Sequence, residues 1–234
     1  MSIADNISSV KAEIEKAAKL CGRDVTEIKL VAVTKTKPVQ MLKEACLCNV
    51  TDFGENKPQE IVAKYPEFEN ENITWHLIGN LQKNKVRHII DKVSLIHSVD
   101  SYELAVEINK RAAAICKVQD ILIQVNISGE ESKSGISPVD AEKLCRQISE
   151  LENVRIKGLM TISVRGNDYE GNFKIFSRLK ELSLKIKELA INNVYMDELS
   201  MGMTHDFQEA IAAGATIVRV GTAIFGERDY NNVN

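Results

Sequence analysis

The sequence predicts an α/β protein in which eight parallel strands close into a (β/α)8 barrel, the TIM-barrel architecture. Short apolar runs alternate along the chain with segments whose apolar residues recur at helical spacing, about eight times in all. The apolar runs are too continuously hydrophobic for strands that expose one face to water, so we expect a parallel sheet covered on both faces. Eight such units favour a closed barrel, and a doubly wound open sheet is the main alternative.

The first half of the chain begins with a helix and continues in strand–helix units. The opening helix, over residues 5–20, places Ile7, Val10 and Ile14 on one face. Pro38 opens the helix after the first strand, because proline is tolerated in the first helical turn. Strands are expected over 29–34, 49–56, 74–81 and 93–100, and the helices that follow them over 38–48, 58–64, 82–90 and 101–117.

The second half repeats the same pattern without a linker or a low-complexity segment. A polar loop over 164–172 separates the sixth strand from a long helix, and Gly214 ends the helix before the last strand. Strands are expected over 120–128, 155–163 and 195–203, helices over 138–150, 173–190 and 206–214, and a last strand with its exit over 215–226. No boundary between domains is visible along the chain.

The composition is that of an ordinary globular protein, 44% hydrophobic and 27% charged over 234 residues. A formal net charge of −3 gives no electrostatic reason to expect nucleic acid or an anionic membrane as a partner. The five cysteines include no CxxC pair, which is typical of free thiols in a reducing compartment. The amino-terminal segment lacks the features of a signal peptide, and no apolar run is long enough to cross a membrane. We therefore expect a cytoplasmic protein.

Small hydroxyl residues and glycines follow the seventh and eighth expected strands. Ser200 and Gly202 end the seventh strand, and Gly221 and Thr222 end the eighth. In this architecture those two strand ends form the standard phosphate site, because glycine lets backbone N–H groups approach phosphate oxygens and hydroxyls add donors. The chain has no GxxxxGK[ST] loop and no GxGxxG after the first strand, so neither a P-loop nor a Rossmann nucleotide site is supported.

Lys35 follows the first strand, across the expected barrel mouth from that phosphate site. A lysine at a strand end can lose its proton through partial desolvation and a nearby positive charge, which Lys37 could supply. A neutral amine that faces a phosphate pocket suggests a Schiff base with a phosphorylated aldehyde, and pyridoxal 5'-phosphate meets both requirements. Arg219 would then face the pyridine nitrogen and keep it unprotonated, which weakens the ring as an electron sink and argues against transamination.

A series of stretches resembles the YggS/PROSC family of pyridoxal phosphate homeostasis proteins, which is related to the N-terminal barrel of alanine racemase. In chain order they are VAVTKTKP, FGENKPQE, WHLIGNLQKNKVR, HSVD, QVNISGEESKSGI, GLMTI and LSMGMTHDFQEAIAAGATIVRVGTAIFG. Together they cover nearly the whole chain and are highly specific, although each alone would be a weak signal. One departure is MTHD, where the family pattern has a serine and another acidic or polar residue after MGM. Thr204 keeps the hydroxyl, and His205 has no assigned role.

The resemblance implies a single-domain barrel over residues 1–234, of the alanine racemase N-terminal type (fold type III among pyridoxal phosphate proteins). It implies that the cofactor is held as an aldimine on Lys35 by a protein without dedicated catalysis, which buffers pyridoxal phosphate in the cell or delivers it to apo-enzymes. The cofactor contacts that it implies are Lys35, Asn56, Arg219 at the pyridine nitrogen, and, in the phosphate-binding segments, Ser200, Met201 through its amide, Gly202, Gly221 and Thr222.

Two enzymatic functions are the alternatives. A small amino-acid racemase would need a second base, which related two-domain enzymes take from a tyrosine of a β-domain and a partner subunit. The chain ends at Asn234, directly after the barrel, so we expect that domain to be absent and the protein to be a monomer; Tyr230 is the only late tyrosine. A cofactor-free Schiff-base aldolase would need an acid–base partner near Lys35, for which Asp100 and Glu55 are candidates.

Some polar residues have a structural explanation as well as a functional one. His76 is either a satisfied core histidine or a site residue. Lys37 is either a rim lysine or a charge that tunes Lys35. The basic run over 83–87 is either a solvated helix face or a docking surface.

Overall fold

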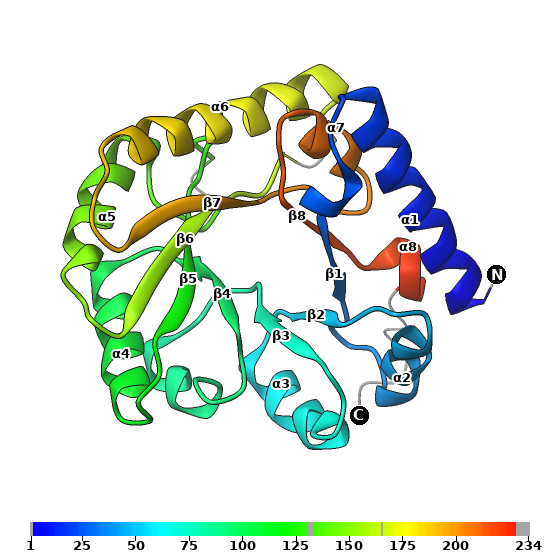
Figure 1. Cartoon of the computed structure of the whole chain (residues 1–234), viewed down its shortest axis with the longest axis horizontal. Helices are drawn as coiled ribbons and strands as arrows, with labels where there is room; N and C mark the ends of the chain where they lie inside the picture. Colours follow the sequence, from blue (N-terminus) through cyan, green and yellow to red (C-terminus); the bar gives the residue numbers. More distant parts are fainter. Residues whose placement is uncertain (1, 131–132, 165, 228–234) are drawn as a thin grey trace.

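The computed structural model describes residues 2–130, 133–164 and 166–227. In these residues eight parallel strands form a closed barrel in chain order (Figure 1). The strands are β1 (Lys29–Val33), β2 (Asp52–Glu55), β3 (Thr74–Leu77), β4 (Leu95–Val99), β5 (Gln119–Gln124), β6 (Val154–Met160), β7 (Val194–Ser200) and β8 (Ile217–Val220). The barrel closes where Val31 of β1 pairs with Arg219 of β8. The predicted barrel is confirmed, and the open-sheet alternative is wrong.

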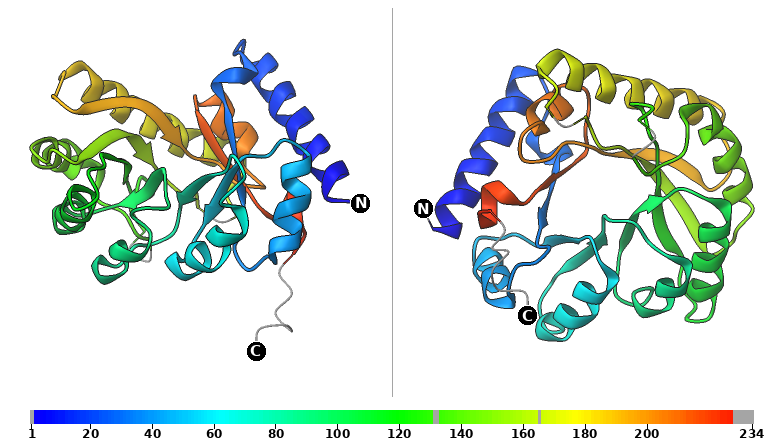
Figure 2. Two further views of the ribbon diagram at one scale, coloured as in Figure 1. Left: turned by 60° about the horizontal axis from the view of Figure 1, so that its bottom comes forward. Right: turned by 180° about the vertical axis from the view of Figure 1, so that it is seen from behind.

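Helices ring the outside of the barrel, and two further views show the same arrangement (Figures 1 and 2). The α-helices are α1 (Ile3–Leu20), α2 (Val39–Leu47), α3 (Pro58–Lys64), α4 (Tyr102–Ala113), α5 (Ala141–Ser149), α6 (Tyr169–Glu188), α7 (Phe207–Ala212) and α8 (Thr222–Phe225), and the 3-10 helices are η1 (Val25–Glu27), η2 (Tyr65–Phe68), η3 (Lys83–His88) and η4 (Pro138–Asp140). The amino-terminal α1 packs against α7 and α8, and Asn6 Nδ2 donates to the carbonyl of Ile224 at 2.9 Å. The two ends of the described chain therefore meet on one side of the barrel.

Three helix boundaries differ from the predictions. Pro38 is the residue before α2, with an extended backbone (φ −70°, ψ 153°), so it does not lie in the first helical turn. The segment predicted as a helix over 82–90 forms the 3-10 helix η3, in which only Val86 is buried. The backbone leaves helical geometry at Ile89 (φ −124°, ψ −11°), and Ile89 and Ile90 are buried at that point. Helix α6 starts earlier than expected because the carboxylate of Asp168 accepts from the amide of Gly171 and caps it.

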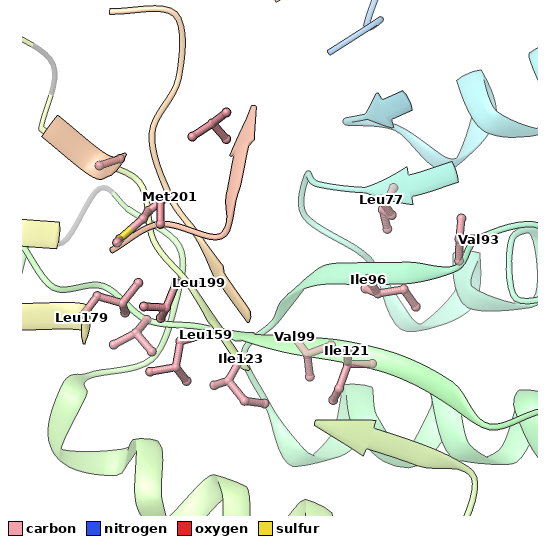
Figure 3. Packing of buried hydrophobic residues seen from close by; sticks show 14 of the residues in the cluster. Leu77, Val93, Ile96, Val99, Ile121, Ile123, Leu159, Leu179, Leu199 and Met201 are labelled. Atoms are coloured by element: carbon pink, nitrogen blue, oxygen red, sulfur yellow. The ribbon is translucent and has the colours of Figure 1, made fainter. Parts of the chain in front are cut away.

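The main hydrophobic core lies between the strands and the helices. Figure 3 shows part of it, where Leu77, Ile96, Ile121, Leu159 and Leu199 each come from a different strand. Since successive side chains of a strand point to opposite faces, their sequence neighbours face the barrel interior. The apolar part of that interior is a small separate cluster of Val31, Leu95, Leu122, Met160 and Ile217.

Polar side chains also face the barrel interior. His76 alternates with the core residues Trp75 and Leu77, so it points inward, and Arg219 shares the inward face of β8 with Ile217. His76 and Arg219 are buried. Across the described residues, the helices lack the length and apolar character that crossing a membrane requires.

Candidate functional site

A cavity of about 490 Å³ opens at the carboxyl ends of the strands. Its wall consists of residues that end or follow every strand except β4. Five of the predicted site residues line it, namely Lys35, Asn56, Arg219, Gly221 and Thr222. This is the end of a parallel barrel at which binding and catalytic residues gather, and it is where the sequence predicts one shared site.

Lys35 lies in a tight turn directly after β1. The amide of Lys37 donates to the carbonyl of Thr34 at 3.0 Å, and Thr36, the third residue of the turn, has a positive φ of 62°. Such a backbone conformation is costly for a β-branched residue and persists only where neighbours hold it. The amide of Thr36 donates to Oε1 of Glu60 at 2.5 Å. The turn keeps Lys35 half-buried on the cavity wall.

Lys37 links this turn to the other end of the chain. Its Nζ donates to the carbonyl oxygens of Phe225, Gly226 and Glu227 at 2.9, 2.9 and 2.8 Å. A cation is favourable there because the last carbonyls of a helix lack partners within it. Lys37 therefore fixes the end of α8 against the end of β1, a structural role that its sequence position did not predict. Its effect on the amine of Lys35 stays a prediction.

Arg219 reaches the cavity from the barrel interior. Its Nη1 donates to Ser200 Oγ at 2.5 Å, and its Nη2 donates to the carbonyl of Thr161 at 2.9 Å. Burial lowers the pKa of Arg219 to about 10, while the negative charge of Asp206 acts against this change. The guanidinium is therefore charged at neutral pH and held in one position by two hydrogen bonds.

The exit of β8 approaches β1 closely through Gly221. A Cβ atom at Gly221 would lie 3.2 Å from both the Cβ and the carbonyl oxygen of Val33, so a larger residue would push the two strand ends apart. The first N–H groups of α8 have no acceptor within the helix, and the exposed residue Thr222 adds a hydroxyl beside them on the cavity wall. This part of the wall offers donors to an anion.

Ser200, Met201 and Gly202 are not on the cavity wall. Ser200 and Met201 are fully buried, and the amide that we expected Met201 to offer to phosphate donates instead to the carbonyl of Ile217 at 3.1 Å. Gly202 has a φ of +87°, and a Cβ there would lie only 2.5 Å from Cβ of Ala210. This glycine is required for the close packing of the β7 exit on α7. In this geometry the Ser200 hydroxyl and the Met201 amide bond to other protein groups, and the phosphate contacts expected of these three residues stay a prediction.

The next residues, Met203, Thr204 and His205, line the cavity instead. Asp206 holds their loop in place, because its Oδ1 accepts from the amide of Met203 at 2.5 Å and its other oxygen accepts from the hydroxyl of Ser163. The sequence shows the hydroxyl of Thr204 at this strand end. It does not show that the carboxylate of Asp206 is buried, since an acidic residue at the start of a helix is usually solvated.

The far wall comes from the loop after β5, part of the stretch QVNISGEESKSGI that resembles the family. Asn126 Oδ1 accepts from the amide of Gly129 at 3.0 Å. Lys133 Nζ donates to the carbonyl of Ser163 at 3.0 Å and lies 3.2 Å from a carboxylate oxygen of Glu130. Among the described wall residues the cations are Lys35, Lys37, Lys133 and Arg219, and none is Asp or Glu. The cavity is therefore suited to an anion.

The two carboxylates proposed as partners of Lys35 lie elsewhere. Glu55 points away from the barrel interior, where its Oε1 accepts from Lys64 Nζ at 2.7 Å and from the Thr34 hydroxyl at 2.6 Å. Burial raises the pKa of Glu55 to about 7, against the attraction of Lys64. Asp100 lines a different, shallow hollow beside η3. The aldolase alternative thus loses both of its candidate acid–base groups.

Other sequence hypotheses have a structural outcome. His76 is a satisfied interior histidine, with hydrogen bonds to His97 and Asp52 at 3.0 Å each. The basic run over 83–87 is largely exposed on η3, so its docking role stays a prediction. No group of three or more His, Cys, Asp or Glu side chains in the described chain is arranged to hold a metal ion.

The chain matches one protein family over most of its length. The family is described as alanine racemase, N-terminal domain, and the match covers residues 5–229. A relative from Aquifex aeolicus, named pyridoxal phosphate homeostasis protein, is 43% identical over 230 residues, which are 98% of this chain and 100% of the relative.

Two solved structures resemble this chain over nearly its whole length. A protein described as unknown, from Bifidobacterium adolescentis, superposes with a TM-score of 0.90 at 38% identity and covers 95% of this chain and 94% of its own. PipY of Synechococcus elongatus PCC7942, solved with PLP bound, has a TM-score of 0.85 at 32% identity, covering 96% of this chain and 100% of PipY.

Proposed function

The chain belongs to the family of pyridoxal phosphate homeostasis proteins, and we propose that it holds pyridoxal 5'-phosphate reversibly in the cavity at the carboxyl ends of its strands. Membership follows from the 43% identity to a relative of that name over nearly the full length of both chains. The observation that carries the proposal is the cavity itself, which brings Lys35 and the donor-rich exit of β8 onto one wall.

The residues present fit this cofactor. The cavity volume of about 490 Å³ lies within the range of small-molecule sites. Gly221 lets the β8 exit lie close against Val33 of β1, where a Cβ would come within 3.2 Å of it. The described wall carries cations and no carboxylate, so a phosphate group meets no like charge there.

We assign the contacts as follows. Lys35 is the attachment residue, and Gly221 and Thr222 bind the phosphate through amide and hydroxyl groups. Asn56 contacts the ring, and Arg219 faces its nitrogen as a fixed cation. When bound, pyridoxal phosphate supplies an aldehyde that a lysine amine can hold covalently and release again.

We assign Ser200, Met201 and Gly202 supporting roles: they position Arg219 and the loop that carries Thr204. The sequence predicted Ser200 as a phosphate donor. We assign that role instead to the hydroxyl of Thr204, which lies on the cavity wall.

The proposed role is storage and delivery without dedicated catalysis, by one barrel domain that acts as a monomer. Two features support it. An arginine at the ring nitrogen withholds the proton that strengthens the ring as an electron sink. The described wall residues include neither a tyrosine nor a carboxylate that could act as a second base. Tyr230, the tyrosine considered for a racemase, lies outside the described residues. Apo-enzymes that require the cofactor are the proposed recipients.

Titration of the full chain with pyridoxal phosphate tests this function. The absorbance of the bound cofactor should saturate at one equivalent for the wild type and for Lys57→Ala, whose lysine is exposed beside Asn56 but does not line the cavity. Lys35→Ala should lose the saturable change. Loaded protein should reactivate an apo-enzyme until free and bound cofactor reach equilibrium. A wild type without saturable binding, or a Lys35→Ala variant that binds like it, would overturn the proposal.

A further inference from the structure

A continuous row of hydrogen bonds crosses the barrel interior and ends at Arg219. His76 Nε2 lies 3.0 Å from Asp52 Oδ1, and His76 Nδ1 lies 3.0 Å from His97 Nε2. His97 Nδ1 lies 2.8 Å from Ser200 Oγ, to which Arg219 Nη1 donates at 2.5 Å. These five side chains come from β2, β3, β4, β7 and β8.

The row links opposite ends of the barrel. Asp52 is the first residue of β2, at the amino ends of the strands, where it also borders a surface hollow with Lys29. Its side chain is 17% exposed, whereas His76, His97 and Ser200 are almost completely buried. Arg219, at the other end, lines the cavity. A group that solvent can reach is thereby connected with the cofactor site through the barrel interior.

The donors and acceptors of this row are consistent with hydrogen bonds that all point the same way, from Arg219 toward Asp52. A carboxylate only accepts, so the proton of His76 lies on Nε2 toward Asp52. A neutral ring then accepts at Nδ1, from Nε2–H of His97, and His97 in turn accepts at Nδ1 from the hydroxyl of Ser200. The guanidinium of Arg219 only donates, and Ser200 Oγ retains a lone pair for it. Every polar atom of the row is satisfied when both rings are neutral.

Burial supports the neutral state of the central ring. His97 is fully buried, and burial, followed by the charges around it, holds its pKa well below the usual value. At the far end of the row, Asp52 Oδ1 also lies 3.7 Å from Lys29 Nζ, an ion pair that favours the charged carboxylate. The carboxylate end of the row is therefore negative at neutral pH.

We propose that Asp52, His76, His97 and Ser200 form a positioning relay that fixes Arg219 in the cavity wall and sets how its charge acts on the bound cofactor. Hydrogen bonds in series polarise one another in a low-dielectric interior, so a change at one end is felt at the other. The charged groups that face the relay are Lys29 on β1, Asp52 on β2, Arg219 on β8 and Asp206 after β7. This inference rests on the proposed function only for its effect on the cofactor.

Nitrogen NMR of the apo-protein tests the relay without any cofactor. At pH 7 both His76 and His97 should be neutral rings with the proton on Nε2. Spectra of His88→Gln and His205→Gln, which remove the two exposed histidines, assign the remaining signals. A charged ring, or a proton on Nδ1 of either ring, would overturn the proposed direction.

The second experiment removes the charge at the far end of the relay in the loaded protein. Asp52→Asn keeps the shape of the side chain and touches no cavity residue. The absorbance of the bound cofactor should then titrate at lower pH than in the wild type, because losing a negative charge disfavours protonation. The dissociation constant should change by at least about twofold. Asp120→Asn is the matched control, since Asp120 lies at the same end of β5 and pairs only with Arg155 in the described contacts.

The outcomes separate the two proposals. If Asp52→Asn gives the wild-type pH profile and affinity, the relay is refuted while cofactor binding stands. If the wild type binds no pyridoxal phosphate, the proposed function fails, and the NMR experiment still decides the direction of the relay. An Asp120→Asn variant that shifts the profile as far as Asp52→Asn would show a general charge effect and refute the relay.

Discussion

Replacing Gly202 by alanine tests how the fold positions the cavity wall. Gly202 lies between β7 and the loop that carries Met203, Thr204 and His205. Two separate costs are expected there. The backbone has a φ of +87°, and an added Cβ would lie 2.5 Å from Cβ of Ala210 and 2.9 Å from Cα of Phe207.

The two costs have different magnitudes. A left-handed backbone costs a non-glycine residue about 1–2 kcal/mol. Overpacking costs a further ~1–3 kcal/mol, because Phe207 is contacted through its backbone and helix α7 must shift as a unit. We therefore expect Gly202→Ala to lower the free energy of unfolding by about 2–5 kcal/mol. With a urea slope of about 2 kcal/mol/M, the unfolding midpoint falls by about 1–2.5 M.

Gly22→Ala is the control, because Gly22 has a φ of +67° but no atom within 4 Å of its added Cβ. It should lose only the backbone part, about 1–2 kcal/mol. Urea unfolding followed by circular dichroism gives both values, and cofactor titration of Gly202→Ala should show weaker binding as the loop moves with α7. Equal losses for the two variants would refute the argument that α7 packing at Gly202 holds the wall.

Two further substitutions test the surroundings of the site. Lys64→Met should cost about 3–5 kcal/mol at pH 8, because it leaves the carboxylate of Glu55 buried and unpaired. The pKa of Glu55 is already raised to about 7, so stability is lost as pH rises through that value. Urea unfolding should therefore show a smaller loss of stability for Lys64→Met at pH 5. Equal losses at both pH values would contradict this. Thr222→Val should weaken pyridoxal phosphate binding about tenfold, the usual loss for a hydrogen bond to a charged group, without changing the urea midpoint of the apo-protein. An unchanged dissociation constant would remove Thr222 from the phosphate contacts.

The barrel could be predicted because each strand is a short apolar run between helical patterns. The helix boundaries depended on less visible features. The segment 82–90 has helical residue types, but the backbone leaves helical geometry at Ile89, directly after η3. Asp168 caps α6 within a loop that the sequence shows only as polar. Local residue preferences therefore predicted where helices and strands occur. They did not predict boundaries that depend on a single contact or backbone angle.

The site was predictable wherever a residue type at a strand end was sufficient. Lys35 and Thr222 follow from their positions after the first and last strands. The contact of Ser200 does not follow from its position in the sequence. Ser200 lies on the inward face of β7, and its hydroxyl accepts a hydrogen bond from Arg219 instead of facing the cavity. The pairing of His76 with His97 depends on the register of β3 and β4, in which His76 lies opposite Leu95. A single sequence does not contain that register.

Reduction of the loaded protein with borohydride, followed by peptide mapping, tests the central claim most directly. The claim is that Lys35 is the attachment point of pyridoxal phosphate on the cavity wall. One reduced cofactor should be fixed per chain, on the peptide that contains Lys35, and Lys35→Ala should incorporate none. A label on Lys133 or Lys37 in the wild type, or no label at all, would contradict the account.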